Sequence, residues 1–300
     1  MKIGYPCINH TINCKGNKTF RLKSYSEKKL IEIVDNNLKC LIKILKFNIN
    51  NNILFFRITS DLIPFASHSI CKYKWQNHFK NNFKIIGNLI KNYNIRISMH
   101  PDQFIVLNSL DENVVNRSIL ELNYHAEVLD LMELDNTAKI QLHIGGAYGN
   151  KEKSLNRFCV NYKKLNNKVK KRLVIENDDK IYSYKNCSYI YKQIKIPLLF
   201  DVFHYKILND GESIKNILKH QNKTWGKKDG IPMIDYSSQK PNSRAGSHSE
   251  NIDIDDFKKF LNDSKPYNFD IMLEIKDKET SALKAVKITK KDKRFCYKDM

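Results

Sequence analysis

Three features of the sequence predict a closed α/β barrel of parallel strands. Eight short runs of aliphatic and β-branched residues are bounded by polar stretches, as buried parallel strands are. Amphipathic segments of helical period separate these runs, which is the alternation of βα units. Six runs also end on a histidine or a carboxylate, and the strand ends of a barrel share one mouth. The chain is therefore predicted to be a TIM (β/α)8 barrel.

The predicted elements follow one another in strict alternation. The expected strands are 3–5, 54–58, 95–99, 139–142, 172–175, 198–200, 231–234 and 271–273. The expected helices lie in 26–45, 77–93, 112–134, 151–170, 183–193, 212–220 and 254–261. The first helix is the clearest, because it starts at the capping residue Ser26 and repeats leucine and isoleucine at three- and four-residue steps.

A doubly wound open sheet is the alternative fold. It is disfavoured because an open sheet would not bring the ends of strands three to eight into one place. We expect a single barrel domain over residues 1–285 and a solvated basic tail over 286–300.

The composition indicates a polyanionic partner. The chain has 300 residues with 52 lysine and arginine against 32 aspartate and glutamate, a formal charge of +20 and a pI near 9.5. Lysine and arginine contacts to phosphate dominate the affinity of proteins for nucleic acids. An AT-rich gene that encodes lysine freely would give the same excess, so the charge supports this interpretation without deciding it.

The cysteines and the hydropathy indicate a soluble intracellular protein. Seven cysteines are scattered without a CxxC pair, which predicts reduced thiols in place of a disulfide framework. The sequence contains no run of eighteen apolar residues, so no membrane span is predicted. The N-terminus lacks the apolar stretch of a signal peptide. We expect a monomer that has no membrane association, and the sequence gives no indication of a protein partner.

Eight side chains at or just beyond the predicted strand ends are candidate metal ligands. They are His100, His143, Glu176, Asp201, His204, Asp235, His248 and Glu274. Histidine is a common ligand of borderline metals, and a carboxylate can bridge two cations. Because one ion takes three to five protein ligands, eight ligands imply two or three divalent ions. Glu176 and Glu274 are the expected bridges.

An isolated histidine or aspartate at a strand end is more often a capping group. Six such groups at equivalent positions make the shared site the better interpretation. His10, His78, His125 and His220 lie on polar or helical stretches without this context, and we interpret them as structural.

Short motifs in a fixed order give the chain a resemblance to the ultraviolet damage endonuclease family over nearly its whole length. The motifs are Gly4-Tyr5-Pro6-Cys7-Ile8-Asn9, Phe47-Asn48, Phe56-Arg57-Ile58, Pro64-Phe65-Ala66-Ser67-His68, Ser98-Met99-His100-Pro101-Asp102-Gln103-Phe104, His143-Ile144-Gly145-Gly146-Ala147-Tyr148-Gly149, Glu176-Asn177-Asp178, Asp201-Val202-Phe203-His204, Asp235-Tyr236-Ser237-Ser238-Gln239, Gly246-Ser247-His248 and Glu274-Ile275-Lys276. The resemblance implies a TIM barrel with a metal cluster, manganese foremost and zinc or magnesium as alternatives. The implied reaction is hydrolysis of the phosphodiester bond on the 5′ side of a photolesion in double-stranded DNA, leaving a 3′ hydroxyl.

The resemblance also implies roles for individual residues. Cyclobutane dimers and 6-4 products are the implied lesions, with abasic sites as a further substrate. Glu176 and Glu274 would bridge the ions, and His68 would contact the scissile phosphate. Gln103 and Phe104 would form a wedge that enters the helix where a photodimer stacks poorly. The remaining implied DNA contacts are Tyr5 and Asn9 on the opposite side of the lesion, and Arg57, Arg244 and Lys276 on phosphates.

Three positions depart from the family pattern. Phe104 replaces a frequent tyrosine, which keeps the ring and loses a hydroxyl contact. Met233 stands where some relatives have a lysine, and methionine cannot be modified or carry a charge. Asp235 stands where others have a histidine, and its harder oxygen ligand favours manganese or magnesium over zinc.

Other functions remain open from the sequence alone. An endonuclease IV-type apurinic/apyrimidinic endonuclease would share the barrel and the metal ligands. A sugar isomerase with two metals would share the fold but not the basic charge or the wedge. A DNA-binding protein with a vestigial metal site is a third possibility of a different class.

Overall fold

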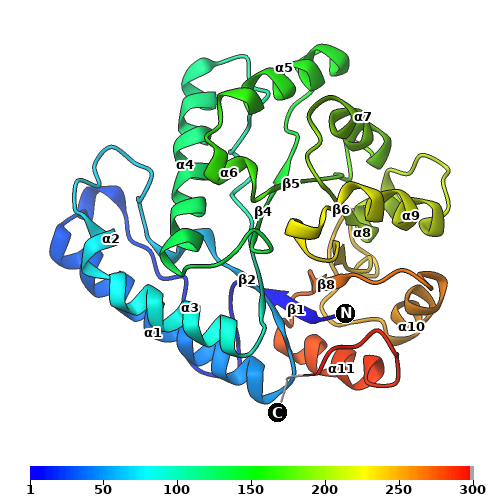
Figure 1. The fold of residues 1–300 in the computed structure, drawn as a ribbon, viewed down its shortest axis with the longest axis horizontal. Coiled ribbons are helices and arrows are strands. Elements are labelled where there is room, and N and C mark those ends of the chain that lie inside the picture. The colour runs from blue at the N-terminus through cyan, green and yellow to red at the C-terminus, as the bar shows by residue number, and fades with distance from the viewer. Residues whose placement is uncertain (298–300) are drawn as a thin grey trace.

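The computed structural model describes residues 1–297 and contains a closed barrel of eight parallel strands with helices around it (Figure 1). Each strand pairs with the next in the chain, and β1 closes the barrel against β8. The strands are β1 (Ile3–Pro6), β2 (Phe55–Ile58), β3 (Arg96–Met99), β4 (Lys139–His143), β5 (Leu173–Glu176), β6 (Leu198–Asp201), β7 (Met233–Tyr236) and β8 (Asp270–Leu273). This confirms the predicted TIM barrel and its eight strands, and rules out the open sheet.

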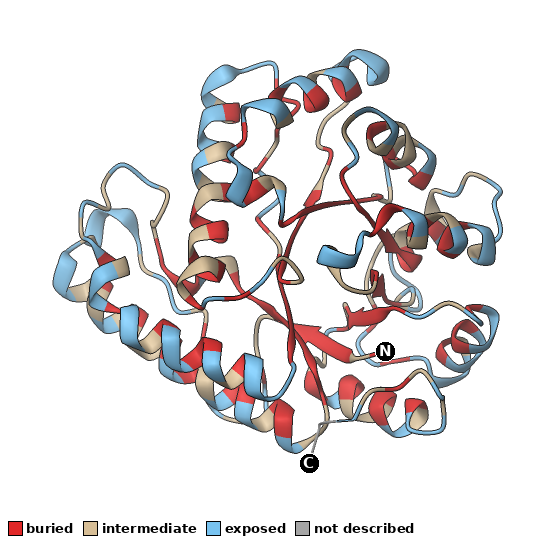
Figure 2. Cartoon of the chain, in the orientation of Figure 1, coloured by how far each residue is buried: buried red, intermediate tan, exposed pale blue. Residues whose placement is uncertain are grey.

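Helices cover the outside of the barrel, with buried residues toward the strands and exposed residues outside (Figure 2). They are α1 (Glu27–Asn50), α2 (Trp75–His78), α3 (Lys80–Asn92), α4 (Glu112–Leu131), α5 (Lys151–Lys164), α6 (Asn167–Lys170), α7 (Tyr184–Ile194), α8 (Val202–Ile207), α9 (Ile214–Thr224), α10 (Ile254–Asp263) and α11 (Glu279–Thr289). Ser26 caps α1 as predicted, since its hydroxyl accepts from the amide of Lys29. Within residues 1–297 the helices lack the combination of length and apolar composition needed to cross a bilayer.

Side chains inside the barrel form an apolar layer beneath a polar layer. The apolar layer is a buried cluster of Phe55, Val174, Leu199, Trp225, Met233 and Met272. Two residues further along the same strands lie Arg57, Glu176, Asp201, Asp235 and Glu274. Side chains two apart on a strand share a face, so these groups point into the barrel nearer the C-terminal ends of the strands. The apolar cluster is thus the floor of the candidate site.

The C-terminal segment packs against the barrel. Helix α11 continues through Thr289, Phe295 is buried, and the amide of Cys296 donates to the carbonyl of Met1 at 2.9 Å. The expected domain boundary at residue 285 therefore falls inside a helix, and residues 286–297 do not form a solvated tail. The many lysines of this segment hid its buried face, which includes Ala285 and Val286. The end of the expected tail, 298–300, lies outside the described residues.

One pair of cysteines forms a disulfide bond. Cys14 and Cys40 are 26 residues apart and their Cα atoms are 5.6 Å apart. Their bond connects the loop after β1 to α1. The prediction that every thiol is reduced is therefore wrong for this pair, because the fold of the loop brings together cysteines that are distant in sequence. The other five cysteines are free.

Candidate metal centre

The eight predicted ligands come together at the C-terminal ends of the strands. Seven of them form three groups, and within each group the ligand atoms lie within 4.8 Å of one another. The groups are His100, His143 and Glu176; Glu176, Asp201 and His204; and Asp201, Asp235 and Glu274. His248 joins them through Glu274, whose Oε2 is 3.8 Å from its Nε2. Glu176 and Asp201 each belong to two groups. The cluster is therefore continuous, and each group resembles the ligand set of one ion.

Glu176 is the central acid of the cluster. Its carboxylate is fully buried, with Oε2 at 3.4 Å from Nε2 of His100 and 3.9 Å from Nε2 of His143. Oε1 is 3.4 Å from Nδ1 of His204. Burial opposes ionisation of Glu176, but the neighbouring imidazoles outweigh it and hold the pKa of this carboxyl well below its usual range. Glu176 is therefore an anion that is ready to bind a cation.

The cluster fits divalent ions because it leaves buried ligand atoms without partners. Glu176 Oε1 and His143 Nδ1 are buried and have no hydrogen-bond partner within residues 1–297. Buried polar atoms without partners are rare, and in a native protein such an atom indicates a missing ion or water. The surrounding set of imidazole nitrogens and carboxylate oxygens suits manganese, zinc or magnesium to different degrees.

Backbone carbonyls orient three of the histidines. Nδ1 of His100 lies 2.7 Å from the carbonyl oxygen of Pro101, and Nδ1 of His248 lies 2.6 Å from that of Glu274. Nδ1 of His204 lies 3.0 Å from the carbonyl of Asn177. Such contacts fix the ring orientation, and in His100 and His248 they leave Nε2 toward the carboxylates.

Asn177 is a positioning residue that the sequence did not reveal. Its Nδ2 donates to the carbonyl of Asp201, and its Oδ1 accepts from the amide of Asp201, both at 3.0 Å. This reciprocal pair connects the ends of β5 and β6. Its position in the motif after Glu176 was a usable signal, because a buried asparagine at a strand end needs hydrogen-bond partners.

A second polar group beneath the ligands consists of Arg57 and Gln141. Arg57 is 4% exposed and Nη2 donates to both carboxylate oxygens of Asp235, at 2.8 and 2.7 Å, while Nη1 donates to Glu274. Gln141 is fully buried and bonds to Arg57, Asp235 and Glu176. The expectation that Arg57 contacts DNA phosphate is wrong, because its guanidinium is directed into the barrel.

Tyr5 and Asn9 also lie inside the protein. Tyr5 is fully buried and Asn9 is 4% exposed. The hydroxyl of Tyr5 donates to Asn48 at 2.7 Å and accepts from Nδ2 of Asn9 at 2.8 Å. The expectation that they line a pocket for the lesion does not hold, because their polar atoms form an internal network between β1 and α1.

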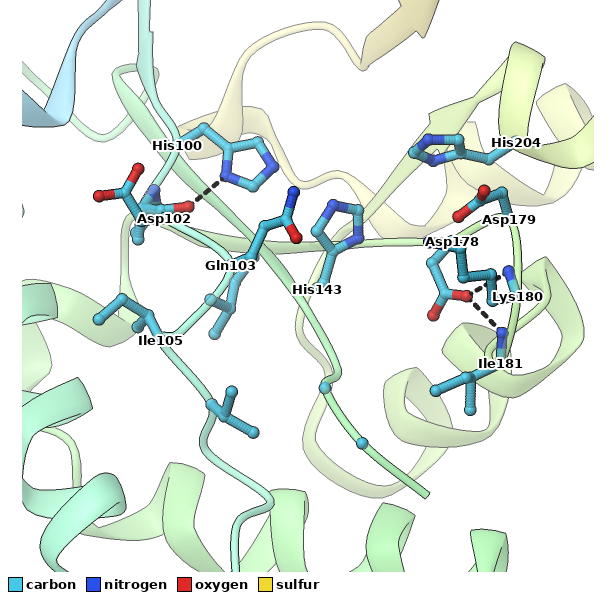
Figure 3. A pocket seen from close by; sticks show the side chains of 15 residues that line it. His100, Asp102, Gln103, Ile105, His143, Asp178, Asp179, Lys180, Ile181 and His204 are labelled. Carbon is cyan, nitrogen blue, oxygen red and sulfur yellow. Dashed lines mark hydrogen bonds between the residues drawn. The ribbon is translucent and has the colours of Figure 1, made fainter. Parts of the chain in front are cut away.

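Gln103 of the expected wedge lines an open pocket beside the cluster, and Phe104 follows it in the same loop. This pocket has a volume of about 330 Å³, and its lining includes His100, Gln103, His143 and His204. Figure 3 shows His100, Gln103 and His143 along one side and His204 across from them. Phe104 is 68% exposed. A ring with this exposure contributes little to the packing of the loop.

The remaining predicted contacts are exposed around the barrel. His68 follows η2 (Ser60–Leu62) in the loop after β2, and its Nδ1 accepts from the amide of Ile70. Arg244 is exposed in the loop after β7. Lys276 is exposed and pairs with Glu250 at 3.0 Å. None of the three has a described contact with the metal-ligand groups.

His125 supports the predicted ligand His100 indirectly, through Ser60. It is fully buried, and Nε2 lies 3.1 Å from Oγ of Ser60, which donates to the carbonyl of His100 at 2.7 Å. The interpretation of His125 as structural agrees with this position.

Fold and cluster together define a TIM-barrel protein with a carboxylate and histidine centre at the strand ends. A family model described as "UV-endonuclease UvdE" matches residues 1–296, and the chain belongs to this family. The family name supports a DNA repair endonuclease.

Named relatives agree with this assignment. The chain is 43% identical over 288 residues to the UV DNA damage endonuclease of Clostridium perfringens (strain 13 / Type A), covering 95% of this chain and 70% of that protein. It is 34% identical over 298 residues to the UV DNA damage endonuclease of Bacillus cereus (strain 03BB102), covering 95% and 93%. The crystal structure of SacUVDE superposes with a TM-score of 0.93 at 46% identity, covering 97% of this chain and 98% of that one.

More distant structures share the fold alone. Endonuclease IV from Thermus thermophilus has a TM-score of 0.57 at 11% identity, covering 84% of this chain and 93% of that one. The D-psicose 3-epimerase of Clostridium cellulolyticum has a TM-score of 0.53 at 10% identity, covering 84% and 92%. The fold therefore does not separate a nuclease from an epimerase, and the family match does.

Proposed function

We propose that this protein is a metal-dependent endonuclease that cuts double-stranded DNA on the 5′ side of ultraviolet photoproducts. The observation that carries the proposal is the Glu176-centred cluster, which borders a pocket lined in part by Gln103, with the exposed Phe104 next to it in the same loop. Family membership supports the substrate class. We further propose that it acts as a monomer on DNA inside the cell, with manganese as the preferred metal.

Each part of the cluster has a defined task in this proposal. The side chains grouped around Glu176, Asp201 and Glu274 would supply the ligands of the ions. Divalent ions bound there would stabilise charge on a phosphoryl oxygen and lower the pKa of a bound water. The chain itself keeps Glu274 ionised: burial would raise the pKa of this carboxyl, but the charge of Arg57 lowers it to about 2. Backbone carbonyls hold His100 and His248 in place.

Lesion recognition would rest on the loop after β3. Gln103 and Phe104 are both exposed, next to His100. A photodimer stacks poorly, so opening the duplex there costs less than at intact sequence, and a side chain inserted into the gap replaces lost stacking. Arg244 and His68 are exposed and free to approach the DNA backbone, as proposed phosphate contacts. Lys276 would have to exchange Glu250 for phosphate.

Replacing Glu176 by glutamine tests the proposal. The change keeps the size of the side chain but removes the charge shared by two ligand groups, so incision of irradiated duplex should fall by at least about 100-fold. Binding of the same duplex, measured by fluorescence anisotropy, should change little because it depends on surface charge and the wedge. Glu127→Gln is the matched control, since Glu127 is half-buried on α4 and bonds to Gln76.

Duplexes with one defined lesion decide the substrate class. Wild-type protein loaded with Mn²⁺ should cut next to a cyclobutane dimer or a 6-4 product, and the same assay measures any cutting at an abasic site. Incision at the abasic site alone would instead identify an apurinic endonuclease.

The Glu176→Gln experiment has its own contradicting outcome. If binding and incision fell equally in this variant, the assignment of incision to the cluster and of DNA binding to the surface would be wrong.

A further inference from the structure

Arg57 lies where a metal ion would otherwise be needed. Of the three ligand groups, the one formed by Asp201, Asp235 and Glu274 already contains a cation. Nη2 of Arg57 contacts both oxygens of Asp235, and Nη1 contacts Oε1 of Glu274. The guanidinium comes from β2, which is far from β7 and β8 in sequence but is separated from β8 in the closed barrel only by β1, and it is almost completely buried.

Gln141 adds further hydrogen bonds to this pair. Its Oε1 accepts from Nη2 of Arg57 at 2.7 Å, and its Nε2 donates to Oδ2 of Asp235 at 2.6 Å and to Oε2 of Glu176 at 2.7 Å. Both oxygens of Asp235 therefore have donors from the protein. In contrast, Oε1 of Glu176 is buried without a hydrogen-bond partner among the described residues. The unsatisfied ligand atoms lie on the side of Glu176, not on the side of Asp235.

The charge of Arg57 is permanent in this position. An arginine guanidinium stays protonated in proteins, and here both Asp235 and Glu274 contact it. A buried arginine that lost both partners would be an uncompensated charge, which is strongly destabilising. A divalent ion between Asp235 and Glu274 would also lie beside the guanidinium and be repelled by it.

We propose that Arg57 is a built-in cation that takes the place of a third divalent ion, so that the chain binds two ions, both at the groups that share Glu176. The inference rests on the proposed metal-dependent function and makes it more specific. Asp235 is then a partner of Arg57 and not a metal ligand. Glu274 retains Oε2, toward His248, for the ion nearest to it.

Metal content measured without any activity assay tests this inference. Each protein is saturated with Mn²⁺, freed of excess metal by gel filtration and analysed by inductively coupled plasma mass spectrometry, with folding checked by circular dichroism. Wild type should contain two ions per chain. Asp235→Asn should also contain two, because Asp235 binds Arg57. Arg57→Met should contain three, because the buried Asp235 and the partly buried Glu274 lose the guanidinium that contacts both of them.

Arg96→Met is the matched control. Arg96 is another buried arginine, 5% exposed, and it pairs with Asp270 at 3.6 Å. Both residues begin their strands, so this pair lies at the opposite end of the barrel from the cluster. Its loss should leave the count at two. Should Arg57→Met fail to fold, Asp235→Asn decides the question alone.

Several results would overturn the inference. A wild-type count other than two ions would do so, as would a decrease in Asp235→Asn or an unchanged count in folded Arg57→Met. A decrease in Asp235→Asn would mean that Arg57 moves away when metal binds and that Asp235 becomes a ligand. None of these results bears on whether the protein cuts irradiated DNA, so the proposed function is tested separately by the lesion duplexes.

Discussion

Replacing His125 by phenylalanine should remove an acid-sensitive contribution to stability. His125 is fully buried on α4, with Nδ1 at 2.8 Å from the carbonyl oxygen of Glu121 and 3.6 Å from its carboxylate. Burial lowers the pKa of His125 from 6.5 to about 4, although the bond to the Glu121 carbonyl acts in the opposite direction. The folded protein thus keeps the ring neutral in a pH range where the unfolded chain protonates it.

The size and sign of the effect follow from these two pKa values. Because the pKa is lower in the folded state, the contribution is fully present above pH 6.5 and is lost as the pH falls toward 4. The full difference corresponds to about 3 kcal/mol of unfolding free energy. Between pH 7.5 and pH 4.5, wild type should therefore lose about 2.5 kcal/mol more than His125→Phe. Phenylalanine keeps a ring beside Tyr124, whose centroid is 5.0 Å from that of His125.

Urea denaturation of the metal-free protein in EDTA measures this difference. Metal is removed first because acid would otherwise release it from the ligand histidines, and that loss of stability would be confused with the titration of His125. His78→Phe is the matched control, because His78 is also a helical histidine but is exposed. If wild type and His125→Phe lose equal stability between the two pH values, the reasoning from burial is wrong.

Two further predictions concern the wedge and the cysteines. Gln103→Ala with Phe104→Ala should reduce the preference for damaged over intact duplex by roughly tenfold, because a stacking ring is lost, while Leu110→Ala, another exposed apolar residue, should not. Anisotropy titrations of both duplexes check this, and unchanged selectivity would contradict the wedge. Thiol titration of the unfolded, unreduced protein should find five thiols, rising to seven after reduction, since Cys14 and Cys40 are bonded. Seven thiols before reduction would exclude the disulfide.

The barrel and its ligands could be predicted from the sequence because both depend on local pattern. Short apolar runs fix the strands, and the residue that ends each run must lie at the mouth if the strands are parallel. His100, Glu176 and Asp201 were found in this way without any knowledge of their partners. Helix α8 was missed because it has only 6 residues and follows β6 immediately.

The errors came from contacts that join distant parts of the chain. Nothing near Cys14 in the sequence indicates that Cys40 will lie beside it. Tyr5 was predicted to contact DNA, but its hydroxyl bonds to Asn48 on α1, which is distant in sequence. Helix α11 was missed because Lys284 and Lys287 interrupt its apolar pattern, while its buried face includes small residues such as Ala282 and Ala285.

The inward orientation of Arg57 could have been predicted from the local sequence pattern. It lies two residues after Phe55 on β2, just as Glu176 lies two after Val174 on β5, and both apolar residues belong to the floor of the barrel. The same alternation that directs Glu176 inward must therefore direct Arg57 inward. A guanidinium inside a barrel needs anions, and the acids at equivalent positions of β7 and β8, Asp235 and Glu274, are the ones within reach. If all inward-facing positions of the barrel are considered together, basic residues as well as acidic ones, the sequence predicts the contact of Arg57 with Asp235 and Glu274. That contact is the basis for the proposed limit of two ions.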